Sequence, residues 1–353
     1  MHRRIRKEEL IMLERKDIIA LMKAAADTAP STCFSFNGEN LSSAAINATL
    51  REQLSELAGT YDLYRANKNQ LFSLIEEAVN DILPQRVLEA YGRFAEVRQF
   101  PQGTMPVFTR KLGRVRAKQF ITRVGLAGVY EVFKLGETNY EVKTSAIGGA
   151  AQIGFEEFLD GRVDFAEVVQ IVMDGMDELI YREIAAALMG AINQLPAANR
   201  VAVAGFNEDA MDQLISVASA YGAPAIYCTR EFAHKMVPQA GWVSDSMREQ
   251  RWNLGYFANY KGVPVIILPQ SFEDETNAKK VIDPGYAWVM HSDEKPVKVA
   301  FEGTLHVRDR ENEDWSRDMQ CYQKVGVGVI MTNSLCSYID TQLQGHLTWP
   351  ASY

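Results

Sequence analysis

Residues 297–331 read VKVAFEGTLHVRDRENEDWSRDMQCYQKVGVGVIM, and this stretch decides the fold. It contains two long strand-like segments, Val297–Asp309 and Gln320–Met331. The short polar segment Glu311–Asp318 joins them. We therefore expect two long strands late in the chain, after a region whose strands are all shorter.

A long helix is predicted upstream, over Asp164–Asn193. Its apolar residues recur on one side of a helix, and Pro196 follows its end. Asp164 and Glu167 have the spacing of an N-terminal capping pair. At about 1.5 Å per residue this helix is on the order of 45 Å long, so we expect it to act as a spine.

The hydrophobic period changes from 3.6 to 2 between about Phe94 and Gly148. Residues 140–146 alternate between two faces, as in a strand, and the region contains few large core residues. A two-stranded hairpin is marginally stable in water by itself. We therefore expect a long extended hairpin that lies on another surface.

A basic run crosses this hairpin. Fourteen residues contain six cations and no acid, and the cations are Arg110, Lys111, Arg114, Arg116, Lys118 and Arg123. Three interpretations stay open: a solvated hairpin face, a nucleic-acid patch, or a contact with an acidic surface of a neighbouring copy. The contact between copies is favoured, because aromatic residues that would stack on bases are few here.

The first ninety residues have helical patterns on either side of a polar loop. Apolar stripes recur over residues 10–22, 46–57 and 71–82, the loop covers Asn37–Ser43, and Pro84 is expected to end the third helix. The region lacks the apolar density of an independent core. We expect it to be an arm that packs on other parts of an assembly.

Short strands and helices alternate between Arg200 and His291, which predicts a compact mixed domain. The helices are expected at Glu208–Tyr221, Glu231–Val237 and Ser244–Trp252. The segment GYAWVM, residues 285–290, is expected to be a buried strand. Residues after Asp340 are expected to be a tail.

Composition limits the classes of protein. The 353 residues contain 47% hydrophobic and 23% charged residues, as in an ordinary globular chain of about two domains. A formal net charge of −8 argues against sequence-reading of nucleic acid. No secretory segment or membrane-spanning run is visible. The four cysteines are scattered without a CxxC pair, so we expect free thiols in a reducing compartment.

No catalytic or cofactor motif is visible in the sequence. The pair Gly326 and Gly328 lacks the third glycine of a dinucleotide site, and the five histidines have no metal-ligand spacing. Acidic residues at 309–314 alternate with arginines, which favours ion pairs over a metal site. We expect no enzyme activity, no cofactor and no metal.

The order of these parts resembles the major capsid protein family of tailed bacteriophages, with the HK-ninety-seven-like or Johnson fold. The resemblance is carried by SAIGGAAQIGFEEF (145–158), YKGVPVIILPQ (260–270) and the closing stretch 297–331. It implies an α+β fold divided into an N-terminal helical arm (1–95), an extended β-hairpin loop (96–148), a peripheral domain with the spine helix (149–199), a mixed α/β axial domain (200–291), return strands of the peripheral domain (292–340) and a tail (341–353).

The resemblance further implies a major capsid protein that self-assembles into hexamers and pentamers of an icosahedral head around double-stranded DNA. The implied partners are other copies, the DNA bound non-specifically, and portal, scaffold and decoration proteins, with no membrane. The implied location is the virion, after assembly in the host bacterial cytoplasm. In some relatives a lysine of the loop forms a cross-link, but no partner can be assigned for Lys111 or Lys118, and none is expected.

Three alternatives remain open. An encapsulin-like nanocompartment shell would share the fold and enclose an enzyme. A cytosolic small-molecule enzyme would use the mixed domain, with His234 or His291 as a base. A tail or baseplate component would form rings or tubes.

Overall fold

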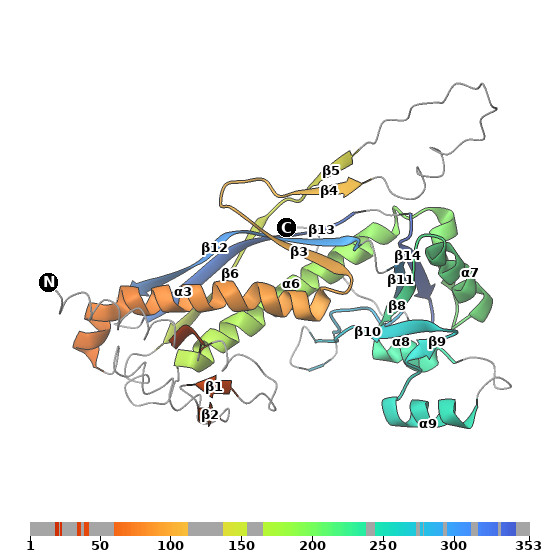
Figure 1. The fold of residues 1–353 in the computed structure, drawn as a ribbon, viewed down its shortest axis with the longest axis horizontal. Coiled ribbons are helices and arrows are strands. Elements are labelled where there is room, and N and C mark those ends of the chain that lie inside the picture. Colours follow the sequence, from red (N-terminus) through yellow and green to blue (C-terminus); the bar gives the residue numbers. More distant parts are fainter. Residues whose placement is uncertain are drawn as a thin grey trace, which may run out of the picture.

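The computed structural model describes residues 18–20, 22, 34–36, 39–41, 60–111, 137–153, 165–237, 244–272, 276–277, 279–291, 295–311, 317–330 and 333–343. These residues form two larger sheets of four and six strands and two pairs of strands. Figure 1 shows the four-stranded sheet and its long helices at one end of the molecule and the six-stranded sheet at the other.

The four-stranded sheet is built around the two long strands that the sequence predicts. In sheet order its strands are β3 (Ala95–Phe100), β12 (Val297–Glu311), β13 (Arg317–Val329) and β6 (Ser145–Ile153). β12 and β13 are antiparallel, β3 is parallel to β12, and β6 is antiparallel to β13. The prediction of two long strands is confirmed, and both extend into the segment expected to join them.

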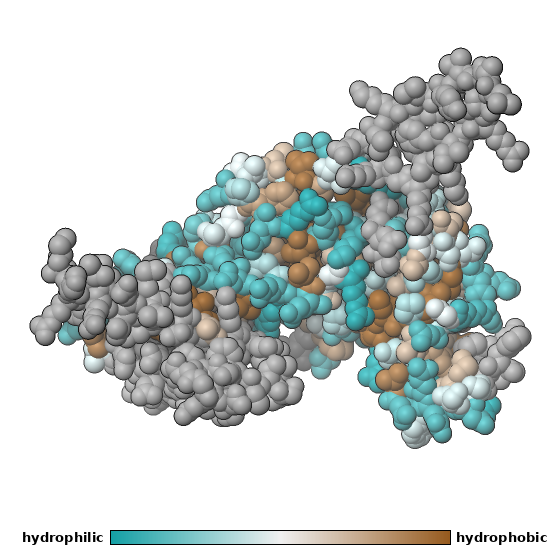
Figure 2. Space-filling model, viewed as in Figure 1, coloured by the Kyte–Doolittle hydropathy of each residue, from teal (hydrophilic) through white to brown (hydrophobic). Residues whose placement is uncertain are grey.

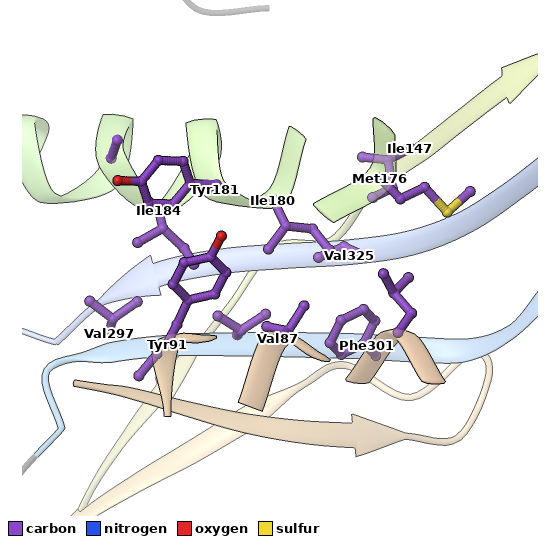
Figure 3. Packing of buried hydrophobic residues seen from close by; sticks show 14 of the residues in the cluster. Val87, Tyr91, Ile147, Met176, Ile180, Tyr181, Ile184, Val297, Phe301 and Val325 are labelled. Atoms are coloured by element: carbon purple, nitrogen blue, oxygen red, sulfur yellow. The ribbon is translucent and has the colours of Figure 1, made fainter. Parts of the chain in front are cut away.

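Two helices lie side by side against one face of this sheet. α3 (Tyr61–Tyr91) contacts β12 and β3, and α6 (Phe165–Ile192) contacts β13 and β6. Figure 3 shows their apolar side chains pointing toward those of the strands, with Phe301 of β12 and Val325 of β13 between them. Burial of each such side chain contributes about 1.5–3 kcal/mol. The predicted spine helix is confirmed as α6.

Pro84 lies inside α3, so the prediction that it ends the third helix is wrong. A proline in a helix interior costs about 3 kcal/mol, because it removes one hydrogen bond and crowds the preceding turn. Leu83 and Val87 next to it have no exposed surface. The burial of this face offsets the cost, and the helix continues to Tyr91.

Three described residues of the N-terminal region pack on the body of the same chain. Ile18, Ile19 and Met22 are buried in the same core as α3 and α6. The expected loop contains strand β2 (Glu39–Leu41), which pairs with β1 (Phe34–Phe36). The helix expected over residues 46–57 lies outside the described residues.

The six-stranded sheet forms the mixed domain. Its order is β7 (Arg200–Val203), β14 (Cys336–Asp340), β11 (Tyr286–His291), β8 (Pro224–Cys228), β10 (Val263–Ile267) and β9 (Asn259–Tyr260). The helical elements around it are η1 (Ala197–Asn199), α7 (Glu208–Ser219), α8 (Arg230–Lys235) and α9 (Asp245–Leu254). The three expected helices and the buried strand GYAWVM are confirmed to within a few residues.

β14 corrects the expected division of the chain. It was expected among the return strands of residues 292–340, but it lies between β7 and β11 of the six-stranded sheet. All five of its residues are buried, as in a strand covered on both faces. Ile339 packs in the core of the four-stranded sheet and its helices, whereas Tyr338 packs in the core of the mixed domain. β14, like β8 and β11, therefore lies between the two cores.

The segment expected to be a tail begins in contact with this sheet. The backbone nitrogen of Thr341 donates a hydrogen bond to the carbonyl oxygen of Val203 at 2.9 Å. Residues 344–353 lie outside the described residues. Within the described part of the chain, no helix is long and apolar enough to cross a bilayer.

Candidate functional site

A two-stranded ribbon projects from the four-stranded sheet on the side opposite α3 and α6 (Figure 1). It consists of β4 (Val107–Lys111) and β5 (Glu137–Glu141), paired antiparallel. At the two ends of the hairpin expected over residues 96–148, the chain belongs to the four-stranded sheet, where β3 pairs with β12 and β6 pairs with β13. The single strand expected over residues 140–146 is interrupted between Glu141 and Ser145.

The root of the ribbon, where its two legs meet the sheet, contains a small apolar cluster of its own. Phe108 of the outgoing leg and Val142 of the return leg are 1% and 6% exposed. The ring of Phe108 meets that of Phe100 edge-on, with 5.6 Å between centroids. The cluster consists of Phe108, Val142, Ala300 and Ile330, with Phe100 and Tyr140 against it. These contacts anchor a ribbon that would be marginally stable alone.

Two glycines of β13 let the return leg cross the sheet in close contact with its backbone. A Cβ on Gly326 would lie 2.5 Å from the carbonyl oxygen of Lys143, and one on Gly328 would lie 3.2 Å from Val142 Cγ2. The amide of Val142 donates to the carbonyl oxygen of Pro106 at 3.0 Å, outside the ladder of β4 and β5. This crossing explains the interruption of the predicted strand.

Charged residues surround the apolar cluster. The carboxylate of Glu96 binds both Lys298 and Arg98, and the Lys298 side chain is only 11% exposed. Arg98 and Lys298 lie 5.4 Å and 5.9 Å from the centroid of the Phe108 ring. Burial alone would raise the pKa of Glu96, but the two cations outweigh burial and lower it. The Phe108 ring, which anchors the ribbon, is therefore in contact with two cations that both pair with Glu96.

Glu302 of β12 contacts both legs of the ribbon. Its carboxylate accepts hydrogen bonds from the Gly103 amide at 3.0 Å, from the Thr144 hydroxyl, and from Lys324 Nζ at 3.1 Å. The residue is 7% exposed. Hydrogen bonds from Thr144 and Gly103, together with Lys324, lower the pKa of Glu302. The carboxylate therefore stays charged at neutral pH.

Two of the six predicted basic contact residues lie in the ribbon. In β4, Arg110 is opposite Thr138 and Lys111 is opposite Glu137. The other four, Arg114, Arg116, Lys118 and Arg123, lie outside the described residues. Their contact with a neighbouring copy remains a prediction.

The sequence patterns do not single out the root residues. Gly326 and Gly328 lack the third glycine of a nucleotide motif, but two glycines on one face of a strand are also a signal of close backbone approach. Phe108 and Glu302 carry no local signal, because their contacts are made with distant parts of the chain.

The histidines and cysteines, which were the candidates for catalysis or metal binding, lie in positions that support the fold. His234 Nδ1 lies 3.1 Å from the carbonyl oxygen of Gly255, where it helps to hold the end of α9, and His291 is buried at the end of β11. Among the described residues, no group of three or more His, Cys, Asp or Glu is placed to hold a metal ion. Cys228, Cys321 and Cys336 are buried free thiols.

Comparisons with known proteins relate this arrangement to viral shells. A family model described as "SPbeta prophage-derived putative capsid protein YonB" matches residues 20–340. None of the curated proteins compared matches the sequence.

The chain is also similar to several solved structures. The mature capsid protein of bacteriophage PhiM1 superposes with a TM-score of 0.51 at 10% identity, over 71% of this chain and 86% of that chain. A virus-like particle from Pyrococcus furiosus gives 0.43 at 11%, over 74% and 98%. The SrpI encapsulin of Synechococcus elongatus gives 0.46 at 12%, over 74% and 90%.

Proposed function

The chain belongs to the family of SPbeta prophage-derived capsid proteins, and from this premise we propose that it builds the icosahedral head of a tailed phage as hexamers and pentamers. Its fold is that of a phage capsid subunit, as the superposition on the PhiM1 capsid protein shows. The predicted α+β, HK-ninety-seven-like fold and the predicted role as a major capsid protein are confirmed. The chain is a structural component of a virion.

The ribbon carries the proposal for how copies join. Its root is buried against the sheet, yet in the described part of the chain neither β4 nor β5 pairs with a third strand. Met105 and Val107 beside the root are 52% and 36% exposed. Unpaired strand edges and exposed apolar side chains are features that a partner covers. The giving and receiving surfaces differ, so the contacts are heterologous and close into rings.

The basic run extends the same proposal. Arg110 and Lys111 begin it in β4, and the remaining four cations follow along the chain. Hydrophilic residues cover much of the described surface in Figure 2, and the chain as a whole is acidic. Opposite charges steer and orient two surfaces. The ribbon of one copy therefore locks onto an acidic surface of the next copy.

The contents of the particle distinguish a phage head from an encapsulin-like compartment. The family favours a phage head over an encapsulin-like compartment. We expect purified particles to contain long double-stranded DNA, which the acidic protein binds only non-specifically, rather than a cargo enzyme. Portal, scaffold and decoration proteins are the further partners that this function requires.

Reversal of charge in the basic run tests the proposal. The variant Arg114→Glu/Arg116→Glu/Lys118→Glu should remain folded, by circular dichroism and thermal unfolding, but should not form closed shells under electron microscopy. Particles of normal size and yield would contradict the assignment of the ribbon as the contact between copies.

A second charge-reversed variant controls for net charge. Arg65, Arg93 and Lys235 are exposed and lie outside the ribbon. Their simultaneous change to Glu alters the net charge by the same amount, and this variant should still form shells. Co-purified DNA should also scale with the yield of closed particles.

A further inference from the structure

We propose that Glu302 is a positioning residue that fixes the direction in which the ribbon leaves the sheet. The inference concerns how a subunit presents its ribbon, and it rests on the proposed function in that the ribbon is the contact between copies. The apolar cluster anchors the ribbon, but apolar contacts have little directionality. Hydrogen bonds depend on angle and therefore orient what they connect.

Three separate segments meet at this one carboxylate. Gly103 belongs to the outgoing leg, Thr144 to the return leg and Lys324 to β13. Because both legs bind the same group, neither can rotate about the Phe108 anchor without losing a hydrogen bond to Glu302. With 7% of the residue exposed, little water is available to replace a lost donor.

A β-bulge aims Glu302 at the ribbon. The pairing of β12 with β13 is regular up to Glu302 opposite Lys324, and it resumes with His306 opposite Tyr322. Gly303, immediately after Glu302, has a φ of +73°, and a Cβ there would lie 3.2 Å from Gln102 Cβ. Bulges commonly re-aim a side chain in this way.

The helix layer holds the bulge from the other side. β3 ends at Phe100, its last residue paired with β12, so the backbone amides that follow the bulge on that edge need other acceptors. The Leu305 amide donates to Asn80 Oδ1 and the Val307 amide to Glu76 Oε1, each at 2.6 Å. Glu302 therefore projects from a frame that α3 fixes, and the ribbon takes its direction from that frame.

Two conservative substitutions separate positioning from simple stabilisation. Glu302→Gln keeps the size of the side chain but replaces one acceptor oxygen with a donor. Thr144→Val removes only the hydroxyl of the return leg. Thr109→Val is the matched control, because Thr109 lies on the exposed side of β4.

Hydrogen exchange of the unassembled subunit measures the effect. In Glu302→Gln and in Thr144→Val, we expect exchange in residues 101–106 and 142–144 to rise about tenfold, as for loss of one hydrogen bond. Exchange in α6 and in β12–β13 should stay at the wild-type level. Thr109→Val should match wild type throughout. Relative to wild type, the double variant should raise exchange by less than the sum of the two single effects, because both changes break one unit.

Assembly supplies the second measurement. Both variants should give fewer closed particles and more irregular ones, at unchanged thermal stability of the subunit. Wild-type exchange in the two legs of Glu302→Gln, or a rise that spreads equally to α6, would overturn the proposal. If the wild-type protein forms no shells while the legs respond as expected, the proposed function fails and the positioning role stands.

Discussion

The molecule contains two antiparallel strand pairs, β12–β13 and β4–β5, that differ in how far the chain itself covers them. β12–β13 is flanked by β3 and β6 and is covered on one face by two helices. β4–β5 has no flanking strand among the described residues and is buried only near its root. The covered pair determines the fold of the subunit, and the uncovered pair is available to a partner.

The two pairs also differ in what closes their edges. On β12, side chains of α3 accept hydrogen bonds from the backbone amides that β3 leaves unpaired. Along the ribbon, neither β4 nor β5 pairs with a third strand in the described part of the chain. Protected edges prevent unwanted pairing between copies, whereas an open edge permits it. The edges of the ribbon are therefore available for the contact between copies that we propose.

The largest expected effect tests whether the two pairs are separate units of stability. Phe301→Ala in β12 removes a side chain with no exposed surface and should lower the free energy of unfolding by about 3–5 kcal/mol. Phe108→Ala at the root is the matched change and should leave the main urea transition in place while the ribbon becomes sensitive to protease. Equal shifts of the main transition would mean that the ribbon unfolds with the sheet.

A smaller effect is expected where the two pairs touch. Gly326→Ala places a methyl group against the carbonyl oxygen of Lys143, which should cost about 1–3 kcal/mol and displace the return leg. Gly149→Ala in β6 is the control, because a Cβ there meets nothing within 4 Å. Thermal unfolding and protease sensitivity of the ribbon measure both. A Gly326 variant that behaves like the Gly149 variant would refute the close crossing.

The smallest effect is a difference in pH response. Burial, and then Asp174, raise the pKa of Asp177 in α6 despite the opposing effect of Arg86. Its Oδ1 is buried without a hydrogen-bond partner. Because the folded-state pKa exceeds the unfolded one, protonation favours folding, and this contribution is lost as the pH rises through the folded-state value. The helix layer should therefore gain stability as the pH falls from neutral.

The ribbon root should respond in the opposite sense. The pKa of Glu302 is lowered, so its contribution persists at neutral pH and is lost only when the pH falls through that lowered value. Asp177→Asn should be more stable than wild type at pH 7, with a difference that shrinks toward acid pH. Glu183, whose pKa burial also raises, leaves a residual pH dependence. Urea midpoints of Asp177→Asn and wild type between pH 7 and 4 measure this difference. If the variant has the same pH dependence as wild type, burial of the charged Asp177 does not cause the pH response.

Local periodicity made part of this fold predictable. α6 was predicted within one residue at each end, because its apolar stripe is continuous and Pro196 follows it. β12 and β13 were predicted because their strand-like runs are longer than the neighbouring runs. The order of the parts then indicated the capsid family. Which domains these elements form in an assembled shell remains a prediction.

Long-range pairing made the rest unpredictable. Pro84 carries a strong local stop signal, and only the packing of α3 on the sheet overrides it. The importance of Glu302 depends on Gly103 and Thr144, which no sequence pattern links to it. The basic run was predictable because charge is visible residue by residue. The roles of Phe108 and Glu302 at the root of the ribbon were not.

The place of β14 has a consequence for the order in which the protein is made. Residues 336–340 leave the ribosome after every other strand of the six-stranded sheet, yet they fill the position between β7 and β11. Until then β7 has no neighbouring strand, although β8 and β11 already contribute residues to both cores. A nascent chain therefore cannot complete this domain, so newly made subunits become competent to meet one another only after synthesis has passed Asp340.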